Sequence, residues 1–188
     1  MNLDTLVLVA ATHAEPTPDV EAAALVPAAP EDVFAFLSDL RNHWRLADRF
    51  VEVVTLEASD GVHADGGRVR VRGPLGLRRT ATIRVVAARA PRLLIGTAEL
   101  AGGTRARVSW TIAGRLGSTR VRLAAELERA RRLDRLLLAA GGRWWLRRRF
   151  ESTLARLGRE LAAATDAERA APLRALVPVD GSGDDDVT

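Results

Sequence analysis

Asp39 and His43 are the residues of this 188-residue sequence whose types and spacing best suit acid–base chemistry. They lie four positions apart in the segment DLRNHW, so on a helix they would share one face. A carboxylate beside an imidazole raises the imidazole pKa and orients the ring, which is the arrangement of a general base. The alternative is an exposed pair that caps or solubilises its helix, and this structural role is the one we expect.

Other kinds of chemistry have little support. The sequence has no cysteine, which excludes disulfides, thiolate metal sites and cysteine nucleophiles. His13, His43 and His63 do not follow a zinc-binding spacing, so we predict no metal and no other cofactor. The phosphate-binding, dinucleotide-binding and serine-nucleophile motifs are also missing.

The segment GGRWWLRRRF, residues 141–150, is the densest mixture of tryptophan and arginine in the chain. On a continuous helix, Trp144 and Trp145 fall outside the apolar stripe that passes through Leu146. They could pack on the preceding segment LDRLLLAA. They could instead form a patch for an anionic membrane surface, with Arg147 and Arg148 on lipid phosphates.

Charge is distributed unevenly along the chain. All 28 basic residues are arginine; residues 1–66 hold 3 arginines and 12 acidic residues, whereas residues 67–165 hold 23 and 6. A basic segment can bind RNA or a ribosome, or it can be neutralised by the acidic part of the same chain. The strand arginines are not interleaved with exposed aromatic residues for base stacking, so a nucleic-acid partner is not expected.

The elements that position these residues follow from periodicity and from Gly or Pro breaks. Residues 1–19 predict a flexible extension, residues 20–164 one domain, and residues 165–188 a disordered acidic tail. No apolar run is long enough to span a bilayer or to act as a signal peptide, and a cytoplasmic protein is expected. A strand is predicted at Val20–Val26, then a helix from Pro30 and a short helix over Asn42–Asp48.

Between Phe50 and Glu128 the sequence has period-two segments separated by short breaks, which predicts consecutive antiparallel strands. Valines alternate with arginines along several of them, so one face of the sheet is apolar and the other arginine-rich. The predicted strands are Val51–Glu57, Gly67–Gly73, Arg79–Ala88, Arg92–Leu100, Arg105–Ala113 and Thr119–Glu128. A helical stripe then recurs at spacings of 4, 4, 3 and 4: Leu146, Phe150, Leu154, Leu157 and Leu161.

This order of elements is typical of a helix-grip fold. The stretch VPAAPEDVFAFLSDLRNHWRLADRF resembles the N-terminal signature of the START-like, or SRPBCC, superfamily, and WWLRRRFESTLARLGREL resembles its C-terminal helix. The resemblance spans residues 20–164. It implies an α+β fold, in which a curved antiparallel sheet of about seven strands, with two short helices, is crossed by a long C-terminal helix.

Members of this superfamily hold lipids, isoprenoids, sterols or polyketides between sheet and helix, so we expect a small hydrophobic ligand carried there. The alternatives are a polyketide cyclase or dehydratase, which the absence of tyrosine hydroxyls disfavours, and the RNA-binding protein considered above. Trp44, at the expected mouth, and the apolar strand and helix faces supply the candidate wall. These residues are Trp44, Val69, Val71, Ile83, Val108, Trp110, Leu123, Phe150 and Leu154.

Overall fold

The elements follow the predicted order. A computed structural model describes residues 17–47, 50–58, 61, 63–73 and 76–170. The elements are β1 (Val20–Val26), α1 (Pro30–Ser38), α2 (Leu40–Ala47), β2 (Val51–Glu57), β3 (Gly66–Arg72), β4 (Arg78–Arg89), β5 (Leu93–Leu100), β6 (Thr104–Arg115), β7 (Ser118–Arg129), α3 (Arg132–Leu137), the π-helical turn η3 (Leu138–Gly142) and α4 (Arg143–Ala170). Most of the predicted flexible extension, residues 1–19, and of the predicted acidic tail, residues 165–188, lies outside the described residues. Helix α4 continues to Ala170, past residue 164, where the predicted domain ends.

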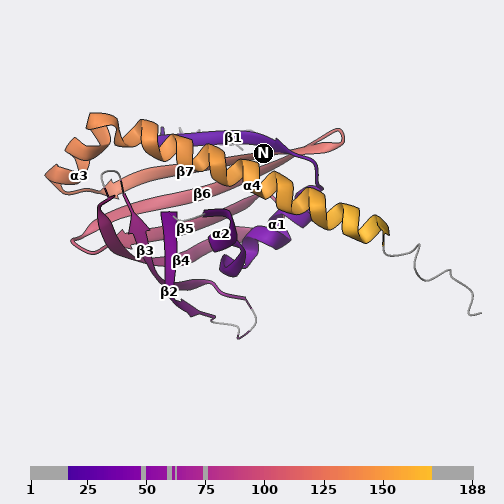
Figure 1. Ribbon diagram of the computed structural model, residues 1–188, viewed down its shortest axis with the longest axis horizontal. Helices are drawn as coiled ribbons and strands as arrows, with labels where there is room; N and C mark the ends of the chain where they lie inside the picture. The colour runs from indigo at the N-terminus through magenta and orange to yellow at the C-terminus, as the bar shows by residue number, and fades with distance from the viewer. Residues whose placement is uncertain (1–16, 48–49, 59–60, 62, 74–75, 171–188) are drawn as a thin grey trace, which may run out of the picture.

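The seven strands form one antiparallel sheet in the order β1-β7-β6-β5-β4-β3-β2. The first strand, β1, pairs with the last, β7, and therefore β1 and β2 are the two edge strands of the sheet. Helices α1 and α2 lie between these edge strands in the chain, and α4 runs diagonally across the sheet (Figure 1). The predicted helix-grip architecture is therefore confirmed.

Irregularities in strand pairing accompany the curvature of the sheet. The register shifts between Val53 and Thr55, between Val85 and Ala87, and between Arg105 and Ala106. Such bulges bend and twist a strand. Gly67 has a φ of +154°, and a Cβ atom there would lie 2.3 Å from the Thr55 carbonyl oxygen. Only glycine fits this close approach of β3 to β2.

Particular residues determine where the two short helices begin. Helix α1 has Pro30 at its start and Glu31 and Asp32 in its first turn, which suit the helix dipole. Asp39 ends α1 in an extended conformation, and its Oδ1 accepts a hydrogen bond of 2.9 Å from the Arg41 amide. Asp39 therefore separates the helices and caps the start of α2.

The middle of α4, from Leu154 to Leu161, packs closely on the sheet. Leu154, Leu157 and Leu161 are buried in one hydrophobic core with Val26 and Ala22 of β1. The small side chains of β1 let the helix approach this edge of the sheet. The predicted helical stripe is thus the surface that closes the fold.

Ion pairs join the acidic first third of the chain to its basic middle. Glu52 pairs with Arg70 at 3.2 Å, and Glu21 pairs with Arg122 of the neighbouring strand. Asp19 adds a contact of 3.3 Å with Arg143 at the start of α4. These contacts neutralise part of the uneven charge within the fold.

Candidate ligand cavity

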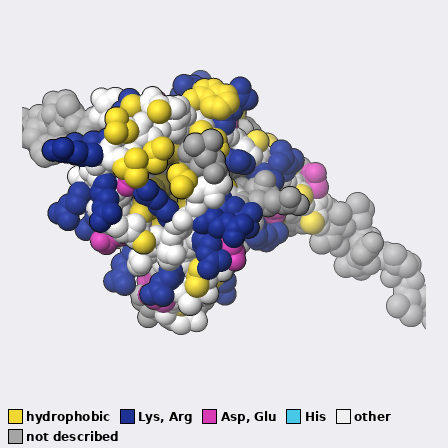
Figure 2. Space-filling view, turned by 60° about the vertical axis from the view of Figure 1, so that its left-hand side comes forward, with side chains coloured by type: hydrophobic (Ala, Val, Ile, Leu, Met, Phe, Trp, Pro, Cys, Tyr) yellow, Lys and Arg dark blue, Asp and Glu magenta, His cyan; other side chains and the backbone are white. Residues whose placement is uncertain are grey.

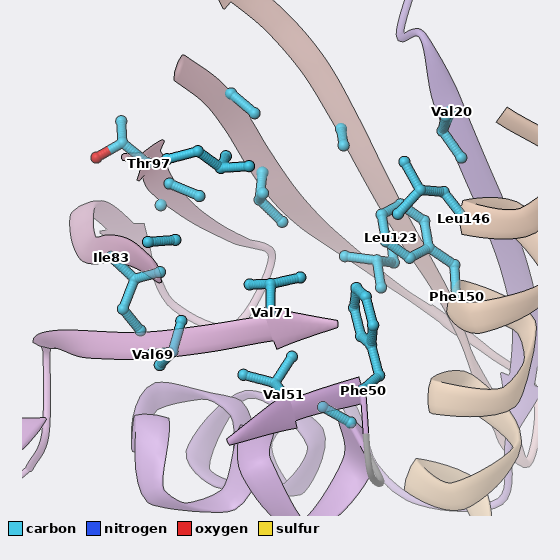
Figure 3. A pocket seen from close by; sticks show the side chains of 18 of the residues that line it. Val20, Phe50, Val51, Val69, Val71, Ile83, Thr97, Leu123, Leu146 and Phe150 are labelled. Carbon is cyan, nitrogen blue, oxygen red and sulfur yellow. The ribbon is translucent and has the colours of Figure 1, made fainter. Parts of the chain in front are cut away.

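A cavity of about 410 Å³ lies between the N-terminal half of α4 and the concave face of the sheet. Leu146 and Phe150 project into it from α4, and Val69 and Val71 reach it from β3 (Figure 3). The helix is close to the sheet at Leu157, but at Phe150 the space between them is not filled. The cavity has the dimensions usual for a small-molecule site.

The structure brings together most of the predicted wall residues. Eight of the nine line the cavity: Trp44, Val69, Val71, Ile83, Val108, Trp110, Leu123 and Phe150. Leu154 does not line it, because one helical turn beyond Phe150 its side chain is already buried in the core at 1% exposure. Spacing alone does not show where along a stripe the helix meets the sheet.

Alanines enlarge the cavity on the strand side. Ala81, Ala106 and Ala125 line it, and so does Ala98, which is paired with Ala106 on the neighbouring strand. A larger side chain at any of these positions would occupy space that is open in the structure. Ala22 and Ala24 of β1 lie in or against the core and do not line the cavity.

One end of the cavity carries a charged cluster that the sequence did not reveal. Buried Asp134 of α3 accepts a hydrogen bond of 2.5 Å from Arg79 Nη1 and another from Thr104 Oγ1. All three residues line the cavity. The Asp134 carboxylate is thus paired, and the cluster ties α3 to β4 and β6. Its only sequence signal is a single acidic residue within an arginine-rich segment.

The predicted Asp39–His43 pair is not joined by a hydrogen bond. Asp39 Oδ1 faces the amides of Arg41 and Ala64, whereas His43 Nε2 lies 2.6 Å from the Leu37 carbonyl oxygen. The two residues do not share a helix face, because α1 ends at Ser38 and α2 begins at Leu40. His43 does line the cavity, with its ring edge-on to Trp110 at 5.5 Å.

Burial lowers the pKa of His43, and this effect outweighs the Leu37 hydrogen bond and the negative charge of Asp39, which both raise it. The imidazole is therefore neutral at pH 7. A carbonyl oxygen can only accept, so the proton sits on Nε2 and Nδ1 is left as a hydrogen-bond acceptor.

This shift predicts an acid-sensitive fold. The unfolded chain binds the His43 proton more readily than the folded chain, so the free energy of unfolding should fall as pH drops below about 6.5, through the lowered folded pKa. The free energy of unfolding, measured with urea, should be lower at pH 5.5 than at pH 7.5. We expect His43→Gln to make this difference smaller by about 1 kcal/mol. Equal pH dependence in both proteins would contradict a buried neutral His43.

Two aromatic residues that the sequence did not place belong to the same wall. Trp145 lines the cavity and packs edge-on against Phe50, with ring centroids 5.1 Å apart. Trp145 is half-buried, whereas Trp144 is 64% exposed. The two adjacent tryptophans thus face different surroundings, and of the pair only Trp144 is available to a partner at the surface.

A curved antiparallel sheet that holds an apolar cavity against a C-terminal helix defines the class of helix-grip ligand-binding domains. The sequence profile of the family described as "Polyketide cyclase / dehydrase and lipid transport" matches residues 17–162. The chain belongs to this family, and so to the START-like (SRPBCC) superfamily that the sequence resembles.

Solved structures share the fold at low sequence identity. TTHA0849 from Thermus thermophilus is 21% identical with a TM-score of 0.58, over 77% of this chain and 97% of that one. A protein from Arthrobacter aurescens is 15% identical with a TM-score of 0.56, over 76% of this chain and 85% of that one. DynU16, from the dynemicin biosynthetic locus, is 18% identical with a TM-score of 0.51, over 77% of this chain and 47% of that one. No curated protein matches the chain.

Proposed function

We propose that the protein binds and carries a small hydrophobic molecule, of lipid, isoprenoid or polyketide type, in the cytoplasm. The observation that carries this proposal is the cavity of about 410 Å³ whose wall is mostly aliphatic and aromatic. Burial of apolar ligand surface there contributes about 25 cal/mol per Å². The family to which the chain belongs includes lipid transport in its description, which supports the same function.

Binding rather than catalysis is favoured by the surroundings of His43. A cyclase or dehydratase needs a positioned acid or base in the cavity, and His43 is the imidazole that lines it. Its ring nitrogen Nε2 is engaged by the Leu37 carbonyl, and Asp39, the carboxylate expected to orient it, caps α2 instead. The predicted catalytic pair is therefore not assembled.

A titration with Nile red, a neutral dye that fluoresces in apolar surroundings, tests the proposal. We expect saturable binding with one site per chain, and displacement of the dye by pyrene or by a long-chain alcohol. Polar metabolites should not displace it, since the wall offers few free polar groups. Absence of saturable binding would contradict the carrier function.

We propose further that the carrier exchanges its ligand at an anionic membrane. No described helix has the length and hydrophobicity to cross a bilayer. Leu133, Leu136 and Trp144, here called the apolar rim, are 59%, 66% and 64% exposed. Leu133 and Leu136 adjoin Asp134 and Leu137 in the chain, and Trp144 adjoins Trp145; these neighbours line the cavity.

The charge around the apolar rim favours anionic lipid. Residues 131–149 contain seven arginines and one acidic residue, Asp134, which is buried against Arg79. The guanidinium of Arg148 lies over the Trp144 ring, 5.1 Å from its centroid. Figure 2 shows hydrophobic side chains among arginines on the end of the molecule where α3 lies. Each arginine near such a membrane contributes about 1 kcal/mol.

Replacing Leu133 and Leu136 together by Asp should weaken binding to vesicles of phosphatidylcholine with phosphatidylglycerol at least tenfold, measured by flotation, because it removes apolar contacts and adds negative charge. Leu116→Asp is the matched control, since Leu116 is fully exposed in the β6–β7 hairpin, away from α3 (Figure 1). Equal loss in both variants, or equal binding to vesicles of phosphatidylcholine alone, would contradict a role for the rim.

A further inference from the structure

Trp44 has a hydrogen-bond donor that nothing in the fold satisfies. In the described part of the chain, its Nε1 is the one buried side-chain nitrogen or oxygen without a partner. Leaving such a group unsatisfied is unfavourable, and buried indole N–H groups usually find an acceptor. Trp44 is also part of the cavity wall. The missing acceptor can therefore come from a molecule in the cavity.

The residue before it offers the complementary group. His43 lines the cavity, and its Nε2 proton is donated to the Leu37 carbonyl over 2.6 Å. Its other ring nitrogen, Nδ1, is then an acceptor. Consecutive residues of α2 thus carry a donor and an acceptor beside a wall that is otherwise mostly apolar.

No positive charge accompanies this pair. The side chains of Arg41 and Arg45, on the same helix, are 52% and 60% exposed and contact Asp39 and Glu160. Arg79 and Arg84 both line the cavity, but Arg79 is paired with Asp134 and Arg84 is exposed. A carboxylate beside His43 and Trp44 would be buried without a cation, which is unfavourable. The surroundings therefore suit an uncharged group.

We propose that His43 and Trp44 form a polar anchor that selects hydrophobic ligands bearing a neutral oxygen, with a hydroxyl as the preferred group. This inference rests on the proposed function and specifies its ligand class. A hydroxyl accepts from Trp44 Nε1 and donates to His43 Nδ1, whereas a ketone uses only the first contact. Nε1 is enclosed in this structure, so the anchor requires the indole to turn toward the ligand oxygen, and satisfying the buried donor favours that movement.

The test compares pyrene, 1-hydroxypyrene, 1-acetylpyrene and 1-pyrenecarboxylate by fluorescence anisotropy at pH 7. The measured quantity is the ratio of the Kd of pyrene to the Kd of each derivative. This ratio is compared between the unmodified protein and each variant, so that differences in solubility between the compounds cancel. Trp44→Phe keeps an aromatic ring and removes the N–H. It should lower the ratio for 1-hydroxypyrene and for 1-acetylpyrene about tenfold.

His43→Gln keeps a donor for the Leu37 carbonyl and removes the ring acceptor, so it should lower the ratio for 1-hydroxypyrene alone. The exposed tryptophan supplies the matched control, because Trp144→Phe should leave every ratio unchanged. In the unmodified protein, 1-pyrenecarboxylate should bind more weakly than 1-hydroxypyrene, and this comparison needs no variant to fold.

Two different failures can be distinguished. If pyrene and all its derivatives fail to bind, the proposed function itself is wrong. If pyrene binds, but the ratio of its Kd to that of 1-hydroxypyrene is the same in the unmodified protein and in folded Trp44→Phe, the polar anchor is wrong and the carrier function stands. Tighter binding of 1-pyrenecarboxylate than of 1-hydroxypyrene would also overturn the anchor.

Discussion

Filling the cavity with Ala98→Phe and Ala106→Phe should weaken Nile red binding about 100-fold while the protein stays folded. The two alanines are paired across β5 and β6, and both line the cavity. Two phenyl rings would occupy the space that the dye needs, and forcing a ligand into a filled site costs about 1–3 kcal/mol. The free energy of unfolding should be unchanged or higher, since the rings bury apolar surface in existing space.

Ala113→Phe is the matched control for this variant. Ala113 lies on β6 like Ala106, but its side chain is exposed and does not line the cavity. Its replacement should leave the dye affinity unchanged. If the double variant binds Nile red as tightly as the unmodified protein, the dye does not occupy the cavity and the proposed site is wrong.

The second prediction is that substitutions at two positions of α4 have different effects, one on stability and the other on ligand binding. Leu157→Ala should lower the free energy of unfolding by about 2–5 kcal/mol, because Leu157 is completely buried and its removal leaves a hole in the core. Phe150→Ala should cost less than half as much, since Phe150 is half-buried beside space that already exists. Its main effect should be a loss of Nile red affinity of about tenfold.

Urea unfolding and dye titration of both variants give the comparison. Leu157→Ala should retain the dye affinity under conditions where it is folded, because Leu157 does not line the cavity. The opposite pattern, in which Phe150→Ala unfolds the protein and Leu157→Ala abolishes binding, would mean that the cavity lies over the other end of the helix.

Periodicity in the sequence predicted the fold well. Alternation of valine and arginine, as at Val69 and Arg70, predicts which face of a strand is buried, and the predicted β1 and β2 coincide with those observed. Glycine and proline breaks predict antiparallel neighbours, and the stripe from Leu146 to Leu161 predicts the covering helix. These features are local, so they can be seen without coordinates.

Other features depend on tertiary geometry that no local pattern encodes. Leu154 and Phe150 belong to one stripe, yet one is core and the other cavity wall, because α4 crosses the sheet diagonally. Trp145 is held in the wall by Phe50, which lies 95 positions earlier in the chain. Asp39 and His43 have a helical spacing, but the helix is interrupted at Asp39 itself, which is extended and separates α1 from α2.

The three isoleucines of the chain offer the most direct test of the central claim, that a hydrophobic ligand binds between α4 and the sheet. Ile83 lines the cavity, Ile112 is buried in the core, and Ile95 is not part of the cavity wall. With isoleucine δ1-methyl labelling, titration with 1-hydroxypyrene should shift the Ile83 signal saturably and give intermolecular NOEs to it. The Ile95 and Ile112 signals should move far less. An Ile83 methyl signal that does not respond, or a larger response at Ile95, would contradict the account.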